Sequence, residues 1–230
     1  MESAVVVSKN TMRDNLLYKG VLMVDVELDY PQISGTVSKH ARQAFNRYYN
    51  VQVNERMTYA RSTLLRSAIE DYENRQSQGY PFNNYALDQT FEVTLNQPPL
   101  VSLYYDVYEF TGGAHGMTNR TGNTWDLRLG RMLKLPELFR PGYDYMSVVR
   151  PAVTAEAHRR EASGEGYFFD NLDQNLAQYF DPANFYLTPE GLAIFYPLYT
   201  ISPYAGGINV FEVPWGLFGN NLRYPLIQFR

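Results

Sequence analysis

Apolar and polar residues alternate along several short stretches of the chain, the pattern of strands that bury one face. The alternation is clearest in Val21–Asp29, where valines and leucines point to one side and acidic side chains to the other. Tyr30 and Pro31 end this stretch, because proline cannot donate to a strand ladder. Similar runs predict six further strands: Thr90–Leu95, Leu100–Phe110, Met117–Leu129, Phe185–Leu187, Leu192–Tyr196 and Asn209–Val213.

A second spacing, with apolar residues every three or four positions, runs from Val37 to Gln78 without a glycine or proline. It predicts one long helix with an apolar stripe, closed by Gly79 and Pro81. Pro151 either kinks the first of two later helices or starts a new helix there. These helices are expected over Tyr143–Ala162 and Asp170–Phe180.

The order of these elements predicts an α+β fold, with an antiparallel sheet covered by one long N-terminal helix and shorter C-terminal helices. We expect a single compact domain over residues 1–230. It is open to division into two intimately packed halves, a strand–helix–strand module over 1–110 and a hairpin and helical module over 111–230. The length of 230 residues suffices for a substantial core in either case.

Composition narrows the classes of function. The net charge is -4 and no run of Lys or Arg is present, so a nucleic-acid partner is not expected. No apolar run approaches the roughly 18 residues of a membrane span, and no signal peptide is visible, so a membrane anchor is expected only upstream of Met1. There is no cysteine, and the three histidines form no cluster with carboxylates, so neither a metal nor another cofactor is expected.

The segment Thr111–Gly116 carries the one candidate catalyst, His115, beside Gly112 and Gly113. It lies between two predicted strands and lacks the Lys-Ser/Thr ending of a phosphate-binding loop, which indicates a hairpin connection. His115 could act as a base oriented by Asp106 or Glu109. The simpler interpretation is a histidine that bonds backbone carbonyls and fixes the turn.

The loop Pro197–Gly207 is the other candidate site, with Pro197, Tyr199 and Tyr204 as its candidate binding residues. Prolines lower the entropy cost of ordering a loop, and tyrosines are favoured contact residues. The loop suits either a protein partner or sugar rings. An ordinary connection packed on the core is the alternative.

Several blocks give the chain a family resemblance. The segment Tyr108–Gly116, with its TGGAHG hexapeptide, resembles the hallmark of a bacterial extracellular family of largely unknown function. Other blocks resemble the same family, in order along the chain: 30–35, 124–139, 185–192, 201–207 and 211–215. That family includes the extracellular part of the lysozyme-binding sigma-V anti-sigma factor and the accessory module of a peptidoglycan deacetylase.

The resemblance implies an extracellular or cell-surface location in a bacterium and a role in cell-envelope biology. Three hypotheses follow. The first is a binding or sensing domain for a protein such as lysozyme, engaged through Pro197–Gly207 and the tip at Gly112–Gly116; the acidic charge favours a basic partner. The second is an accessory module that binds cell-wall glycan on its tyrosines. The third is a hydrolase that uses His115.

Overall fold

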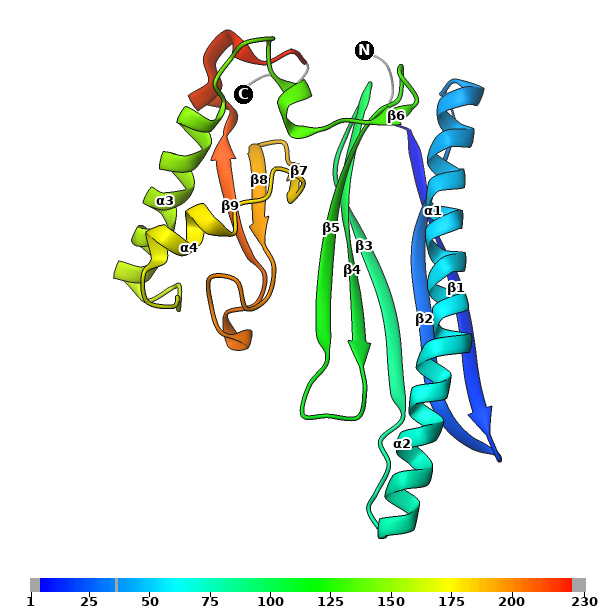
Figure 1. The fold of residues 1–230 in the computed structure, drawn as a ribbon. Coiled ribbons are helices and arrows are strands. Elements are labelled where there is room, and N and C mark those ends of the chain that lie inside the picture. The colour runs from blue at the N-terminus through cyan, green and yellow to red at the C-terminus, as the bar shows by residue number, and fades with distance from the viewer. Residues whose placement is uncertain (1–4, 36, 225–230) are drawn as a thin grey trace. The chain divides into compact units, whose positions relative to one another are not determined.

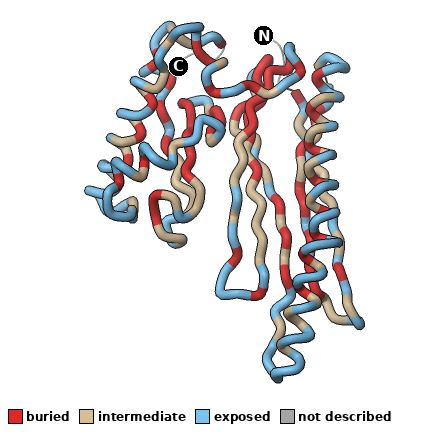
Figure 2. Tube along the Cα trace, viewed as in Figure 1, coloured by how far each residue is buried: buried red, intermediate tan, exposed pale blue. Residues whose placement is uncertain are grey.

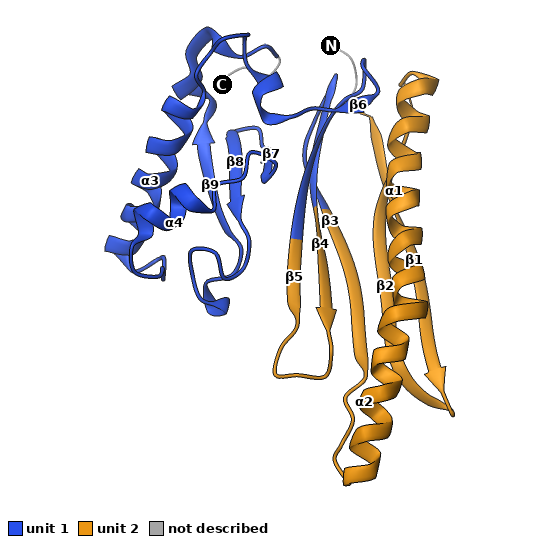
Figure 3. Ribbon diagram, in the orientation of Figure 1, with its two compact units in different colours: residues 1–4, 92–104, 120–230 blue, residues 5–91, 105–119 orange. Residues whose placement is uncertain are grey.

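The computed structural model describes residues 5–35 and 37–224, which form two compact units (Figures 1 and 3). Among the described residues, unit 1 holds 92–104 and 120–224, and unit 2 holds the remainder up to residue 91 together with 105–119. Both units contain helices and strands, in keeping with the expected α+β class. The described residues contain no helix long and apolar enough to cross a membrane.

One sheet has the strand order β1-β2-β3-β4-β5-β6. It is mixed, which corrects the expectation of an antiparallel sheet. β1 and β2 are antiparallel, but β2 and β3 run parallel over five residue pairs, from Val24 opposite Tyr85 to Leu28 opposite Gln89. The cause is the helical crossover between these two strands, which returns the chain to the end of the sheet where it started. The strand bounds are Val6–Tyr18, Val21–Ser34, Tyr85–Gln97, Leu100–Phe110, Met117–Asp126 and Arg131–Met132.

The described residues open with strand β1, which was not predicted, so the long helix expected in the N-terminal part is the third element and follows two strands. The pattern did not reveal β1 because its sequence is largely polar, with Lys9 and Arg13 pointing to solvent. Both charges pair across to β2, where Lys9 meets Asp29 at 2.9 Å and Arg13 meets Glu27 at 2.6 Å. Charged side chains are a common feature of edge strands, where they discourage pairing with other chains.

The helical stretch follows β2 and consists of three consecutive elements: α1 (Lys39–Tyr59), a π turn (Ala60–Leu64) and α2 (Leu65–Gln78). It begins after Ser38, whose hydroxyl accepts a hydrogen bond of 3.1 Å from the amide of Ala41. Buried residues in α1 recur every four positions, and each such step overshoots a full turn by about 40°. The wider π turn holds back this drift, so the next buried residues still face the sheet. The buried residues are Ala41, Phe45, Tyr49, Val53 and Met57, then Ala60, Leu64 and Ala68.

The core of unit 2 lies between this helical stretch and strands β2 and β3 (Figure 2). Val24, Val26 and Leu28 of β2 are fully covered, as their alternation predicted, and Asp25 and Glu27 are exposed. Asp29 departs from the pattern. It is buried on the opposite face, where its carboxylate is stabilised by the charge of Lys9 and by a 2.6 Å hydrogen bond from Thr11.

Unit 1 contains a second, antiparallel sheet made of β7 (Phe185–Leu187), β8 (Gly191–Tyr196) and β9 (Asn209–Pro214). The helices α3 (Met146–Ser163) and α4 (Leu172–Gln178) share one hydrophobic core with this sheet. The prediction of a single sheet covered by all the helices is therefore wrong, because the described residues form two sheets. α3 continues through Pro151 as one helix. Short 3-10 turns complete the unit at Leu135–Leu138, Tyr204–Gly206 and Trp215–Asn221.

The parts of β4 and β5 that belong to unit 1 meet β7 at a close backbone approach. A Cβ on Gly122 would overlap the carbonyl oxygen of Phe185 and lie 2.8 Å from its carbonyl carbon. Beside it, the hydroxyl of Ser102 accepts a 2.8 Å hydrogen bond from the amide of Leu187 and lies 2.9 Å from the hydroxyl of Thr124. A glycine is therefore required at position 122 for the small sheet to pack there.

Candidate functional site

The hairpin tip expected at Thr111–Gly116 joins the neighbouring strands β4 and β5 in unit 2. Gly112 is buried with a φ of 77°, a conformation that side chains with a Cβ rarely adopt. A Cβ there would also lie 3.4 Å from both the carbonyl oxygen of Asn83 and the ring of Tyr85. The tip is thus fitted against the chain that leads from α2 into β3.

The remaining glycines of the tip differ in their surroundings. Gly113 is exposed, and a Cβ there would have only the carbonyl oxygen of His115 near it, at 4.0 Å. Gly116 is buried, and a Cβ there would overlap the carbonyl oxygen of Glu109 and lie 2.5 Å from the ring of Tyr108. Close packing of the two strands therefore explains Gly116, and Gly113 is the glycine of the tip that faces open space.

His115 is exposed, and its Nδ1 atom lies 3.0 Å from the carbonyl oxygen of Gly116. The two carboxylates suggested as its orienting groups are three residues apart in β4, so they lie on opposite faces of the strand. Glu109 contacts Tyr59 of α1. Burial raises the pKa of Tyr59, and the charge of Glu109 and its hydrogen bond with the tyrosine raise it further. The contact of Nδ1 with the Gly116 carbonyl is of the kind expected for a histidine that fixes the turn, and the role of His115 stays a prediction.

The aromatic loop Pro197–Gly207 connects β8 and β9 in unit 1. Tyr199 is 45% exposed and has a φ of 63°, which is uncommon for a residue with a bulky side chain. Its ring centroid is 5.9 Å from that of Tyr204, with 35° between the planes. The hydroxyl of Thr200 donates a 2.6 Å hydrogen bond to the carbonyl of Pro197. The loop thus holds the exposed ring of Tyr199 and the half-buried ring of Tyr204 in a defined arrangement.

Buried hydrogen bonds to neighbouring segments hold this loop in place. Ser202 is 1% exposed, and its hydroxyl accepts a 2.6 Å hydrogen bond from the amide group of Asn209 at the start of β9. The carbonyl of Ile201 accepts a 2.9 Å hydrogen bond from the amide of Phe169. Sequence reasoning missed this neighbouring segment, in which Tyr167 and Phe169 are exposed. The signal available was the aromatic run at 167–169 between a glycine and an aspartate.

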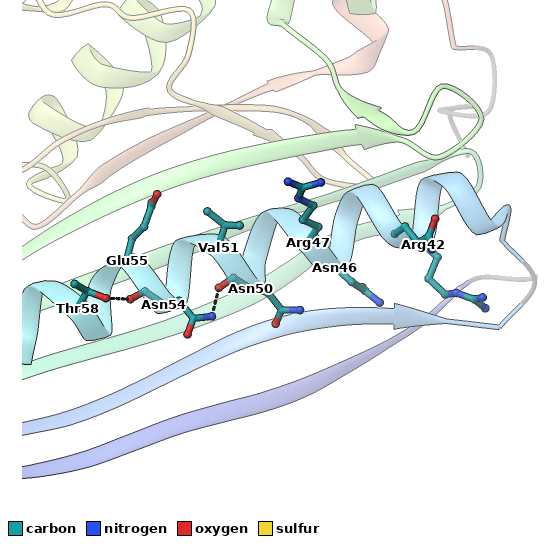
Figure 4. Close-up of a pocket in the computed structure, with 9 residues that line it drawn as sticks. Arg42, Asn46, Arg47, Asn50, Val51, Asn54, Glu55 and Thr58 are labelled. Atoms are coloured by element: carbon teal, nitrogen blue, oxygen red, sulfur yellow. Dashed lines mark hydrogen bonds between the residues drawn. The ribbon is translucent and has the colours of Figure 1, made fainter.

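An open groove of about 970 Å³ runs along α1 in unit 2 (Figure 4). Its described lining comes from α1 alone and contains no aromatic ring. Its amides serve the fold: Asn46 accepts from the backbone amide of Ile33 at 2.8 Å and donates to its carbonyl at 3.2 Å, and Asn54 donates to the carbonyl of Asn50 at 2.6 Å. The groove therefore presents polar and charged side chains to a ligand, whereas the aromatic loop presents ring surface.

Within residues 5–35 and 37–224, no three His, Asp or Glu side chains lie close enough together to hold a metal ion. The hairpin tip belongs to unit 2 and the aromatic loop to unit 1, so each is a candidate on its own. Of the two, the aromatic loop presents more ring surface to solvent.

The described residues form a two-unit α+β chain. Residues 21–118 match a family model described as "Deacetylase PdaC", and residues 136–216 match one described as "Protein of unknown function (DUF3298)". The first match contains the hairpin tip and the second contains the aromatic loop. No curated protein matches the chain.

Two solved structures share the fold over nearly the whole chain. A DUF3298 family member from Bacteroides fragilis NCTC 9343 has a TM-score of 0.71 and 20% identity, covering 97% of this chain and 96% of its own. A DUF3298 family protein from Pseudomonas aeruginosa PAO1 has a TM-score of 0.64 and 18% identity, covering 98% of both chains. At these identities the likeness concerns the fold. Together with the two family models, the shared fold supports the similarity of this chain to a bacterial family of unknown function.

Proposed function

We propose that this chain is an extracellular, cell-envelope-associated accessory module that binds cell-wall glycan on the aromatic loop of unit 1. The observation that carries the proposal is Tyr199, an exposed ring held at positive φ and paired with Tyr204. Strained backbone persists only where the surrounding structure enforces it, and it is concentrated at functional sites.

The envelope setting is supported by the family model of a deacetylase that matches residues 21–118. It agrees with the resemblance of the hexapeptide and the downstream blocks to the accessory module of a peptidoglycan deacetylase. An accessory module of this kind needs affinity for the polymer and no chemistry of its own.

The aromatic loop suits sugars for a physical reason. The face of an aromatic ring carries partial negative charge and attracts the slightly positive C–H bonds on one side of a pyranose ring. The tyrosine hydroxyls can in addition bond to sugar hydroxyls. Because the loop is already ordered by Thr200 and Ser202, little entropy is lost when a ligand binds.

Co-sedimentation with insoluble peptidoglycan tests the proposal. We expect the wild-type protein to be retained and Tyr199→Asn to lose about three- to tenfold in affinity, the contribution of one stacked ring. Asparagine is chosen because it tolerates a positive φ better than alanine, so the loop keeps its backbone.

Tyr80→Ala is the matched control, because Tyr80 is 61% exposed but belongs to unit 2. It should sediment like the wild type. Equal retention of the Tyr199→Asn and wild-type proteins would remove the glycan site from this loop.

A protein ligand such as lysozyme is the second candidate, since the resemblance extends to the sigma-V anti-sigma factor. The observation in its favour is charge: the chain carries a net charge of -4, and lysozyme is basic. Calorimetric titration with lysozyme at two salt concentrations tests it, with an affinity that falls as salt rises as the expected result. No heat at high micromolar lysozyme would exclude this partner.

A further inference from the structure

A second exposed aromatic strip lies in the connection between α3 and α4. Tyr167 is 73% exposed and Phe169 is 38% exposed, whereas Phe168 between them packs into the core of unit 1 with its ring centroid 6.5 Å from that of Phe211. This alternation turns the two outer rings to solvent while the middle ring anchors the segment. Exposed apolar side chains that are held in place in this way mark interaction surfaces when they are grouped.

The strip adjoins the aromatic loop. The amide of Phe169 donates to the carbonyl of Ile201 at 2.9 Å, and a Cβ on Gly206 would lie 3.4 Å from the carbonyl oxygen of Tyr167. Two segments some thirty residues apart in sequence therefore run side by side in unit 1. We call their four rings, Tyr167, Phe169, Tyr199 and Tyr204, the aromatic platform.

We propose that the aromatic platform is an extended glycan site with two subsites, Tyr199 with Tyr204 and Tyr167 with Phe169. Its ligand is then an oligosaccharide several rings long and not a single sugar or a disaccharide. This inference rests on the proposed glycan function and specifies the length of chain that the module recognises.

The chemistry of the exposed side chains favours a sugar chain over a protein for this surface. Within residues 163–207, all of which are described, the large hydrophobic side chains with substantial exposure are all aromatic, and no Leu, Ile, Val or Met is among them. Aromatic rings alone suit stacking on the C–H faces of successive sugars. Asp170 and Asn171 follow the strip as exposed polar residues and can bond to sugar hydroxyls.

Calorimetry with β-1,4-linked N-acetylglucosamine oligomers of two and six units tests the platform. We expect the wild type to bind the longer oligomer more tightly than the shorter one. Tyr167→Ala should weaken binding of the longer oligomer about three- to tenfold and leave the shorter one within about twofold, because a short ligand already fills the Tyr199 subsite. Tyr199→Asn should weaken both.

Tyr179→Ala is the control, since Tyr179 is 40% exposed in unit 1 but lies outside both segments, and it should bind like the wild type. Two results overturn the inference while the glycan function stands: Tyr167→Ala without effect on either oligomer, or with an equal effect on both, in a protein whose binding depends on Tyr199. Failure of the wild type to bind either oligomer, despite retention on peptidoglycan that depends on Tyr199, also overturns it. Loss of peptidoglycan retention altogether overturns the proposed function itself. Phe169→Ala provides a second variant and should follow Tyr167→Ala.

Discussion

Gly122 is the position where a single added methyl group should cost the most stability in unit 1. In the wild type, the backbone of β5 at Gly122 passes directly against the backbone of β7 at Phe185. An alanine Cβ would overlap the carbonyl oxygen of Phe185, lie 2.8 Å from its carbonyl carbon and lie 3.3 Å from the ring of Phe195. The clash is with backbone, so no side-chain rotation can relieve it.

The magnitude follows from what must move. β7 carries Phe185 and Leu187, which are 4% and 0% exposed, and its register with β8 fixes their place in the core. Overpacking that forces a backbone shift costs about 1–3 kcal/mol. We expect Gly122→Ala to reach the upper end, about 3 kcal/mol, which for a chain of this size lowers the Tm by about 6–12 °C.

Tryptophan fluorescence during urea unfolding reports on the correct unit. Trp125 and Trp215 are the two tryptophans of the chain; both belong to unit 1 and both are buried. Gly216→Ala is the matched control, because a Cβ at Gly216 would have no atom within 4 Å, and it should change the free energy of unfolding by less than about 0.5 kcal/mol. If Gly122→Ala stays within about 1 kcal/mol of Gly216→Ala, the close approach of β5 and β7 is wrong.

Three further predictions concern turns and buried charge. Asp126 is fully buried; burial raises its pKa, but hydrogen bonds from Arg128, Tyr224 and Leu129 outweigh burial and hold the pKa below its usual value. The charged carboxylate therefore stabilises the fold fully above the unfolded-state pKa of about 4, and this stabilisation is lost as the pH falls through the lower folded-state pKa. Asp126→Asn should lower the free energy of unfolding by about 1–3 kcal/mol at pH 7, and in urea titrations this difference from the wild type should shrink between pH 5 and 3. A difference that stays constant with pH would contradict the prediction. Gly112→Ala should destabilise unit 2 by about 1–2 kcal/mol, the cost of a left-handed backbone with a Cβ, as measured by far-UV circular dichroism; an unchanged midpoint would contradict the positive φ. His115→Ala should cost less than about 1 kcal/mol in the same measurement, and a larger loss than that of Gly112→Ala would make the histidine the key residue of the turn.

Residue patterns predicted those parts of the fold in which one face of an element is apolar. The alternation of β2 and the spacing over residues 39–78 are of this kind, because burial of one face leaves a period in the sequence. β1 escaped prediction because it is an edge strand of largely polar sequence, and its pairing with β2 leaves no apolar period. The parallel pairing of β2 with β3 follows from the helical crossover that joins them and not from the residue pattern of either strand.

The candidate site divides in the same way. Tyr199 and Tyr204 could be singled out because proline and glycine mark their loop. Tyr167 and Phe169 could not be separated from Phe168 by sequence, since which ring of the three faces the core depends on Phe211. Exposure of an aromatic residue is decided by what packs behind its neighbours, and those contacts join segments distant in sequence.

The hexapeptide at Thr111–Gly116 and the aromatic platform therefore differ in what requires their residues. Gly112 and Gly116 are required by backbone geometry, and that requirement would hold in the absence of any ligand. Tyr199 and Tyr167 satisfy no comparable need of the fold, since exposing a ring to water gains nothing for folding. A change in the hexapeptide should therefore be interpreted first as a change in the stability of unit 2. A loss of binding that leaves both units folded is the result that would identify a site, and the solvent-facing rings are where such a result is to be expected.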